Sequence, residues 1–423
     1  MWLIRDSDAL FMDLYELTMA QVYFEKKMNN RACFEVTIRR LPEHWGFFVM
    51  AGLAEVESYL NEFDFTKDDI DYLRSTKIFS DDFLSYLVGL RPKIEIRCLP
   101  EGTVFFPNEP VFELSGDLIC AQIMESYILN ILGFSIIAAT LAARISLAAK
   151  GLAVIDFGLR RSQGPAASLR SARAAQMAGF RATSNLFAAR GLDFPPAGTM
   201  AHSFIEVHDS EQQSFINFAD AYGQNAILLV DTYDSIEGIK KAAKAAKQIY
   251  KEKGIKIRGV RIDSGDLAGL SKYARKYFGQ NDVEFLKVFV SGDLDEFRIA
   301  ELLKTDAPID GFGIGTRFAV SCSAPSVQIV YKIIRYGDKD LLKTSPEKES
   351  RPGRKSFIRL KDKYYQKDIV CRLQSAEQDL LQPFESAEKM QTIQERLTNE
   401  LSFLDDSIKA IRNPQEYTVE FKC

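Results

Sequence analysis

The chain has 423 residues, 46% of them hydrophobic and 26% charged, which is the composition of an ordinary soluble globular protein with room for two or three domains. Its 54 lysines and arginines are balanced by 58 aspartates and glutamates, and a net charge of −4 without a basic stripe argues against nucleic acid as a partner. No membrane partner is expected, and the six scattered cysteines, none in a C-x-x-C pair, are typical of a reducing cytoplasm rather than of a disulfide framework or zinc site.

Residues 1–121 predict an α+β domain. Its expected elements are an amphipathic helix over 8–26, a strand over 32–41, a helix over 47–63 and a series of short strands over 93–118. This part of the chain carries no catalytic constellation of its own. Tyr15, on the first helix, is expected to be a core or interface residue unless a site lies nearby.

From residue 122 to 340 the pattern becomes regular, because an apolar helix over 122–149 is followed by strand-like runs that alternate with helices. The runs lie at 152–157, 197–202, 226–231, 257–263, 286–291 and 310–314, and the helices at 166–178, 235–253, 266–278 and 295–304. Such alternation predicts a parallel sheet. Polar groups follow nearly every run, which is typical of a closed α/β barrel, whereas an open doubly wound sheet concentrates them at one switch point. We therefore predict an irregular α/β barrel.

Residues 341–423 are expected to form a charged structural appendage. A loop leads into a hairpin that turns at Lys361-Asp362, followed by a charge-rich helix over 385–412 and a closing strand over 416–421.

Residues 157–192 contain no acidic side chain but six arginines, namely Arg160, Arg161, Arg170, Arg173, Arg181 and Arg190. The guanidinium group binds phosphates and carboxylates through two parallel hydrogen bonds. For the arginines on helix faces, pairing with surface acids is the better interpretation. Arg160 and Arg161 directly follow a buried strand, and for them anion binding is favoured.

Three further groups at strand ends are candidates for chemistry. RIDSGD (261–266) suits a magnesium-bound pyrophosphate and ribose hydroxyls, although a structural Arg–Asp network is equally compatible with it. GFGIGTR (311–317) is a glycine-rich turn whose N–H groups can bind phosphate or merely connect two elements. His202 suits a nucleophile or an acid–base group, with a structural histidine as the alternative. His44 is expected in a loop; His208 lies six positions after His202 without a third ligand candidate nearby, so zinc is not expected.

At this point the chain resembles the nicotinate phosphoribosyltransferases along nearly its whole length. The matching blocks are DLYELTMAQVYF (13–24), EGTVFFPNEPVFEL (101–114), FGLRRSQGP (157–165), ATSN (182–185), GTMAHS (198–203), RIDSGDL (261–267), SGDLDE (291–296), GFGIGT (311–316), PGRK (352–355) and NPQEYTVEF (413–421). Two short stretches depart from the family. Ala166-Ala167-Ser168 replaces an acidic residue and a glycine, and Arg181-Ala182 replaces the usual Asp-Gly.

The resemblance implies a type II phosphoribosyltransferase fold, in which an irregular α/β barrel is combined with an α+β domain built from both chain ends. It implies that nicotinate and phosphoribosyl pyrophosphate give nicotinate mononucleotide and pyrophosphate, an entry step of NAD salvage. Mg²⁺ is the implied cofactor and ATP the implied co-substrate, hydrolysed through transient phosphorylation of His202. The implied assembly is a homodimer with shared active sites.

The resemblance also implies roles for single residues. Arg160 and Arg261 would neutralise the pyrophosphate, Asp263 and Asp266 would hold Mg²⁺, Asp263 would alternatively bind ribose hydroxyls, and Asp231 would orient His202. Substrate binding is expected of Ser291 and Gly292, and binding of the 5′-phosphate of Gly313, Gly315 and Thr316. Phe157 and, from the neighbouring protomer, Tyr15 would enclose the pyridine ring, and Ser203 would donate to its carboxylate.

Three other functions compete with this one. Quinolinate phosphoribosyltransferases share the fold class but are shorter and lack the terminal blocks. Nicotinamide phosphoribosyltransferases carry an aspartate at the position of Ser184. A silent binding homologue would be favoured by loss of His202, Arg261 or Asp263, and all three are present.

Overall fold

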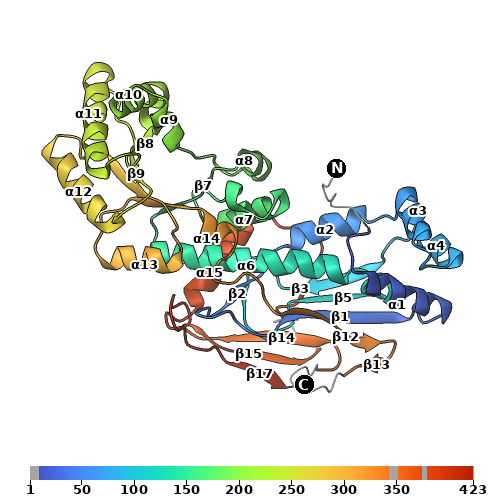
Figure 1. The fold of residues 1–423 in the computed structure, drawn as a ribbon. Coiled ribbons are helices and arrows are strands. Elements are labelled where there is room, and N and C mark those ends of the chain that lie inside the picture. Colours follow the sequence, from blue (N-terminus) through green and yellow to red (C-terminus); the bar gives the residue numbers. More distant parts are fainter. Residues whose placement is uncertain (1–8, 343–350, 374–378, 423) are drawn as a thin grey trace. The chain divides into compact units, whose positions relative to one another are not determined.

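The computed structural model describes residues 9–342, 351–373 and 379–422, and the chain divides into two compact units (Figure 1). The first unit comprises Met1–Thr140 and Ser326–Cys423, and the second comprises Leu141–Pro325. The sequence placed its boundaries at 121/122 and 340/341. The tail after residue 340 thus shares one unit with the N-terminal part of the chain, as expected for a domain built from both chain ends.

The first unit is organised on a six-stranded sheet of order β13-β12-β1-β5-β3-β16. Its strands are β1 (Arg31–Ile38), β3 (Ile94–Cys98), β5 (Phe112–Asp117), β12 (Ile329–Tyr336), β13 (Lys339–Asp340) and β16 (Gln382–Pro383). β1 lies between β5 and β12 and is antiparallel to both, so strands from both ends of the chain pair directly. A second sheet joins β14 (Lys355–Lys361), β15 (Tyr365–Arg372) and β17 (Val419–Lys422). The predicted hairpin is confirmed, with its turn at 362–364.

Buried ion pairs attach the C-terminal segment to the six-stranded sheet. Lys355 Nζ lies 2.7 Å from Glu35 of β1, and the Arg354 guanidinium lies 2.6 Å from Glu113 of β5. Both carboxylates are buried. A buried charge is tolerated only when it is paired and hydrogen-bonded. The PGRK block that contributed to the family resemblance therefore has a structural role.

The helices of the first unit are α1 (Leu14–Glu25), α2 (Leu53–Glu62), α3 (Lys67–Ser75), α4 (Asp81–Leu87), α5 (Leu118–Gln122), the first part of α6 (Glu125–Ala149) and α15 (Met390–Phe403). The helix predicted over 47–63 was wrong in its first part. Phe48–Val49 forms a strand, β2, which pairs with β4 (Val104–Phe105), and Gly52 at φ 109° then starts α2. Pairing with a distant strand overrode the local helical pattern.

One helical stretch, Leu118–Ala149, is long and apolar enough to cross a membrane, but 83% of its most apolar window is buried inside the protein. It therefore packs as a core helix.

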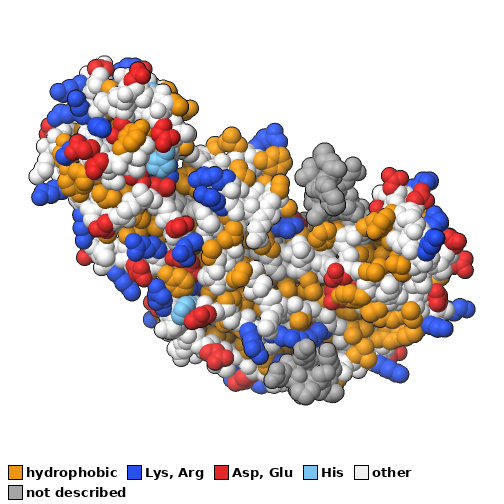
Figure 2. All heavy atoms as spheres, viewed as in Figure 1, with side chains coloured by type: hydrophobic (Ala, Val, Ile, Leu, Met, Phe, Trp, Pro, Cys, Tyr) orange, Lys and Arg blue, Asp and Glu red, His pale blue; other side chains and the backbone are white. Residues whose placement is uncertain are grey.

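On the face of the molecule in Figure 2, basic and acidic side chains are interspersed.

The second unit contains six parallel strands in the order β7-β6-β11-β10-β9-β8. They are β6 (Ala153–Asp156), β7 (Ala182–Thr183), β8 (Ile227–Leu229), β9 (Gly259–Ile262), β10 (Lys287–Val290) and β11 (Gly311–Ile314). The order is a cyclic permutation of the chain order, because the last strand pairs with the first. A barrel has this order, and here it stays open between β7 and β8, which do not pair within the described residues. The predicted irregular barrel is confirmed.

The strand predicted at 197–202 was wrong. β7 lies earlier in the chain, only a single bridge from Thr183 to Pro196 extends the pairing, and the helix α9 (His202–Glu206) begins at His202. The bridge consists of two hydrogen bonds, from Thr183 N to the Pro195 carbonyl (3.0 Å) and from Ala197 N to the Thr183 carbonyl (2.9 Å). The other helices of this unit are α7 (Pro165–Met177), α8 (Leu186–Leu192), α10 (Glu211–Tyr222), α11 (Ser235–Lys253), α12 (Leu267–Gln280), α13 (Glu296–Lys304) and α14 (Thr316–Ala319).

Candidate active site

All the predicted site residues except Tyr15 lie in the second unit, most of them at or just after the C-terminal ends of the parallel strands. Tyr15 lies on α1 of the first unit. In parallel sheets the carboxyl ends of the strands share one edge, and this edge is where α/β barrels place their active sites.

Asp156, the last residue of β6, organises the first part of this edge. Its buried carboxylate accepts hydrogen bonds from Gly158 N (2.7 Å) and Thr183 Oγ1 (2.7 Å), and its carbonyl accepts one from Ser184 N (2.8 Å). Burial raises the pKa of Asp156 above its ordinary value. These bonds join the end of β6 to the loop that carries Ser184. Neither Asp156 nor Thr183 was predicted as a site residue, although Asp156 directly precedes the FGLRRSQGP block and Thr183 lies inside the ATSN block.

Phe157 packs directly against Gly313. The Phe157 N–H donates to the carbonyl of Ile314 (2.7 Å), which ties the end of β6 to β11. A methyl group on Gly313 would lie 2.5 Å from Cε2 of the Phe157 ring. Carbon atoms in contact prefer about 3.5–4.0 Å, so only glycine permits this position of the ring. The Arg261 guanidinium lies 5.9 Å from the ring centroid.

Arg261 of β9 is held by three groups from different strands and loops. Its Nη1 donates to Asp263 Oδ1 (2.9 Å) and to Ser291 Oγ (3.1 Å), and its Nη2 donates to the carbonyl of Met200 (3.0 Å). Ser291 Oγ also donates to Asp263 Oδ1. The Nε atom is buried and has no hydrogen-bond partner within the described residues. Burial lowers the pKa of Arg261, against the effect of the Asp263 and Asp231 carboxylates.

Asp231 follows β8 and binds the loop after β9. Its Oδ2 accepts hydrogen bonds from Asp263 N (3.2 Å) and Ser264 Oγ (2.6 Å), while its Oδ1 is buried and unpartnered among the described residues. His202 Nδ1 lies 3.1 Å from Thr232 Oγ1. Thr232, which the sequence did not single out, is therefore a hydrogen-bond partner of the His202 ring.

Gly292 brings the end of β10 against the end of β9. Its φ of 90° is in the left-handed region, and a methyl group here would lie 1.9 Å from the carbonyl oxygen of Asp263. Only glycine adopts this conformation without strain and allows two backbones to approach so closely. The predicted binding residues Ser291 and Gly292 are thus part of the frame around Arg261 and Asp263.

The two predicted magnesium ligands differ in whether their carboxylates are available to bind a metal ion. Asp266 caps α12, because its Oδ1 accepts from Gly269 N (3.1 Å), whereas Asp263 is half-buried at the strand end. No group of three or more metal-binding side chains occurs among the residues that the structure describes. Mg²⁺ often needs only one or two protein carboxylates because substrate phosphates and water complete its shell. Asp263 fits a magnesium ion of that kind.

The remaining predicted residues lie on turns and short helices of the second unit. Arg160, on a short 3₁₀ turn (Leu159–Arg161), and Ser203, in α9, are exposed. Gly315 precedes α14, and Thr316 is its first residue, half-buried.

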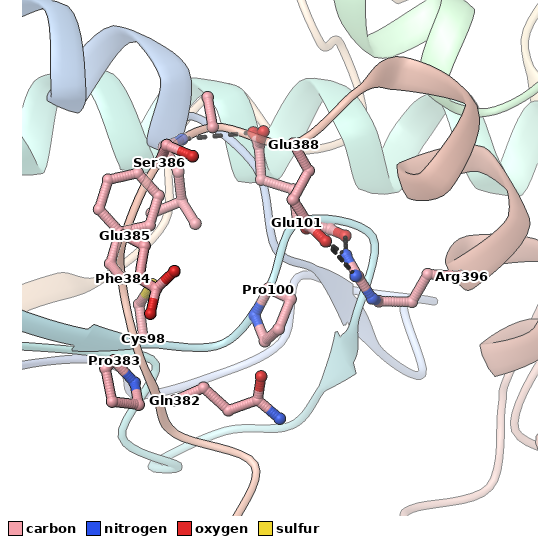
Figure 3. Close-up of a pocket in the computed structure, with 12 residues that line it drawn as sticks. Cys98, Pro100, Glu101, Gln382, Pro383, Phe384, Glu385, Ser386, Glu388 and Arg396 are labelled. Atoms are coloured by element: carbon pink, nitrogen blue, oxygen red, sulfur yellow. Dashed lines mark hydrogen bonds and ion pairs between the residues drawn. The ribbon is translucent and has the colours of Figure 1, made fainter.

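A pocket of about 470 Å³ lies in the first unit (Figure 3). Arg396 forms an ion pair with Glu388 and donates to the carbonyl of Glu101, and the Glu101 carboxylate accepts from Gly52 N (2.6 Å) and Leu53 N (3.2 Å) at the start of α2. These polar groups serve the fold. The lining contains no residue predicted for the site.

Both the sequence and the fold of this chain are similar to those of known proteins. The N-terminal domain model of nicotinate phosphoribosyltransferase matches residues 10–133, and the nicotinate phosphoribosyltransferase family model matches residues 152–365. The chain is 43% identical over 351 residues to a nicotinate phosphoribosyltransferase of Mycobacterium tuberculosis, covering 83% of this chain and 75% of that one. It is 35% identical over 363 residues to the Bacillus subtilis enzyme of that name, covering 84% and 74%.

Among solved structures, the human nicotinic acid phosphoribosyltransferase has the same fold, with a TM-score of 0.84 at 24% identity over 97% of this chain and 98% of that one. Two family models in the right order, relatives above one-third identity, and a barrel edge that carries the family's blocks all point the same way. The chain belongs to the nicotinate phosphoribosyltransferase family.

Proposed function

We propose that this protein transfers the phosphoribosyl group of phosphoribosyl pyrophosphate to nicotinate, with release of pyrophosphate, in NAD salvage. The observation that carries the proposal is the frame of Arg261, Asp263 and Ser291 at one barrel edge, with Phe157 packed on Gly313 beside it. Departure of pyrophosphate leaves an oxocarbenium-like ribosyl centre, so catalysis depends mainly on positioning and charge stabilisation.

The frame supplies both requirements. Arg261 is held in place by bonds to Asp263, Ser291 and Met200, so its charge is oriented before substrate binds. The Arg261 Nε and the Asp231 Oδ1 are a donor and an acceptor without partners among the described residues. Buried polar atoms are rarely left unpaired, and a bound phosphate or ribose would supply the missing partners. Mg²⁺ held at Asp263 would offset the charge of the departing pyrophosphate.

Phe157 provides an apolar face for the pyridine ring, and Gly313 sets the position of that face. Ser203 and Ser184 are the hydroxyl groups assigned to the carboxylate side of nicotinate. Neither is an acid, so neither repels a carboxylate. Nicotinamide phosphoribosyltransferases carry an aspartate at the position of Ser184, so the serine here favours nicotinate over nicotinamide as the substrate.

A pyrophosphate-release assay with purified protein tests the proposal against its competitors. Nicotinate should support release, and nicotinamide and quinolinate should not. Release only with nicotinamide or quinolinate would reassign the substrate, and no release with any of them would favour the silent homologue. Arg261→Lys keeps the charge but loses the planar fork, and it should reduce the rate strongly.

ATP hydrolysis through His202 is the second part of the proposal. When His202 Nδ1–H donates to Thr232 Oγ1, Nε2 carries the free lone pair and can attack the γ-phosphorus of ATP. A P–N bond then replaces the P–O bond to ADP, and water later releases phosphate. Wild-type protein incubated with γ-labelled ATP should acquire acid-labile phosphate. His208→Ala is the matched control and should still be labelled, whereas equal labelling of His202→Ala would overturn the assignment.

The third part concerns assembly, which we propose is a cytoplasmic homodimer with shared sites. Tyr15 belongs to the first unit and every other site residue to the second. Tyr15→Ala and His202→Ala proteins should each be impaired. After subunit exchange, half of the dimers are mixed and each has one intact site, so activity should recover to about a quarter of wild type. Confirmed mixed dimers without recovery would refute the shared site.

A further inference from the structure

The buried carboxylate of Asp156 binds two neutral donors from different parts of the chain. Its Oδ1 accepts from the N–H of Gly158 (2.7 Å), and its Oδ2 accepts from the hydroxyl of Thr183 (2.7 Å). Hydrogen bonds to an ionised group are roughly twice as strong as bonds between neutral groups. Loss of either donor would leave a buried charge with less compensation, which is costly. The carboxylate therefore holds both donors in place.

The Thr183 hydroxyl extends this constraint across Ser184. Thr183 Oγ1 accepts from the backbone N–H of Asn185 (3.1 Å), so its one proton is left for the Asp156 carboxylate. The N–H of Ser184 donates to the backbone carbonyl of Asp156 (2.8 Å). The residues on both sides of Ser184, and its own backbone, are thus tied directly or through one hydroxyl to Asp156.

The side chain of Asn185 fixes the far end of the same segment. Its Oδ1 accepts from Ala188 N (3.1 Å) and caps α8, and its Nδ2 donates to Ser168 Oγ (3.4 Å) in α7. The four polar side chains of this network are at most 4% exposed, whereas Ser184 is half-buried. The network therefore surrounds one hydroxyl that remains partly accessible to a ligand.

The pairing of β6 with β7 does not by itself require a buried charge. The two strands already pair through their backbones, with Ile155 opposite Ala182 and Asp156 opposite Thr183. Apolar side chains of similar size would pack there at lower cost than a buried carboxylate. The charge is explained if the segment that carries Ser184 has to be held in one position.

We propose that Asp156 is a positioning residue, which acts through Thr183 to hold Ser184 at the carboxylate side of nicotinate. The inference rests on the proposed function, because it takes Ser184 to contact that carboxylate. Asp156 is buried, so its loss should act on nicotinate through Ser184. Binding of phosphoribosyl pyrophosphate, which we assign to other strand ends, should be unaffected.

Steady-state kinetics test the proposal. Asp156→Asn has nearly the same size, but its amide leaves either the Thr183 hydroxyl or the Gly158 N–H without an acceptor. KM for nicotinate should rise about tenfold, the effect of losing one hydrogen bond to a charged group, with KM for phosphoribosyl pyrophosphate unchanged. Thr183→Val should raise KM for nicotinate at least as much, and Thr183→Ser, which keeps the hydroxyl, should stay near wild type. Asp306→Asn is the control, because Asp306 is exposed and its φ of 52° suits asparagine.

A double variant shows whether Asp156 acts through Ser184. Ser184→Ala removes the hydroxyl, so Asp156→Asn should raise KM for nicotinate no further in that background. Additive effects, an unchanged KM in Asp156→Asn, or an equal rise in KM for phosphoribosyl pyrophosphate would overturn the positioning role. If Asp156→Asn does not fold, the comparison of Thr183→Val with Thr183→Ser carries the same test.

Amide hydrogen exchange, which needs no turnover, separates this proposal from the proposed function. In Asp156→Asn, exchange should become faster at Gly158, Ser184 and Asn185, and in Asp306→Asn it should remain as in wild type. Faster exchange in a protein that makes no nicotinate mononucleotide would refute the proposed function and leave the holding of Ser184 intact. Unchanged exchange at these amides would overturn the role of Asp156.

Discussion

Gly313→Ala should displace the aromatic ring that we assign to nicotinate. The added methyl group would lie 2.5 Å from Cε2 and 2.6 Å from Cδ2 of Phe157. Contact distances of about 3.5–4.0 Å mean that the ring must move by roughly 1 Å. Overpacking of this kind costs about 1–3 kcal/mol, or roughly 5- to 150-fold if the cost falls on substrate binding. We expect kcat/KM for nicotinate to fall within that range.

The assay is pyrophosphate release with varied nicotinate, together with thermal unfolding of the same proteins. Gly279→Ala is the control, since nothing lies within 4 Å of a methyl group at that position in α12. In Phe157→Ala protein the clash is absent, so Gly313→Ala should cost little more there. Unchanged kcat/KM in Gly313→Ala, or full additivity with Phe157→Ala, would refute the reasoning that the glycine serves the ring.

Three further outcomes follow from the geometry. Gly292→Ala should unfold at a lower temperature and lose activity, because its φ is 90° and its methyl group would meet the Asp263 carbonyl at 1.9 Å; an unchanged melting temperature would contradict this. Burial raises the pKa of Glu16 to about 7, so the folded state keeps a proton that the unfolded state releases, and stability should decline as pH rises from about 4.5 to 7 and then level off. Urea unfolding of Glu16→Gln should lack this decline. Ser184→Asp should raise KM for nicotinate by roughly a thousandfold, from about 4 kcal/mol of repulsion at 4 Å and an effective dielectric near 20; an unchanged KM would place Ser184 outside the pocket.

Much of the second unit could be predicted from the sequence. The apolar runs that became β8, β9, β10 and β11 were found at nearly their observed positions, and the polar residues after them predicted a barrel. Buried parallel strands are recognisable because both their faces are apolar and because glycine and charged residues follow them. The observed sheet order adds that β6 and β11 pair while β7 and β8 do not, which no local pattern encodes.

The helix predicted over 47–63 was wrong in its first part because a partner distant in the chain outweighed local preference: Phe48 and Val49 look helical with their neighbours but pair with β4. The strand predicted at 197–202 was wrong because the pairing of this part of the chain with Thr183 is a single bridge at Pro196 and the helix α9 begins at His202.

The residue types and spacing of the strand ends by themselves determined the barrel and most of its candidate chemistry, since charge and glycine at those places are local properties of the chain. Only the tertiary structure decided which groups meet. It showed that His202 contacts Thr232, that Asp156 binds both the Thr183 hydroxyl and the backbone of Ser184, and that Gly313 packs against Phe157. Such contacts depend on side-chain packing between strands that are far apart in sequence, and spacing along the chain does not record them.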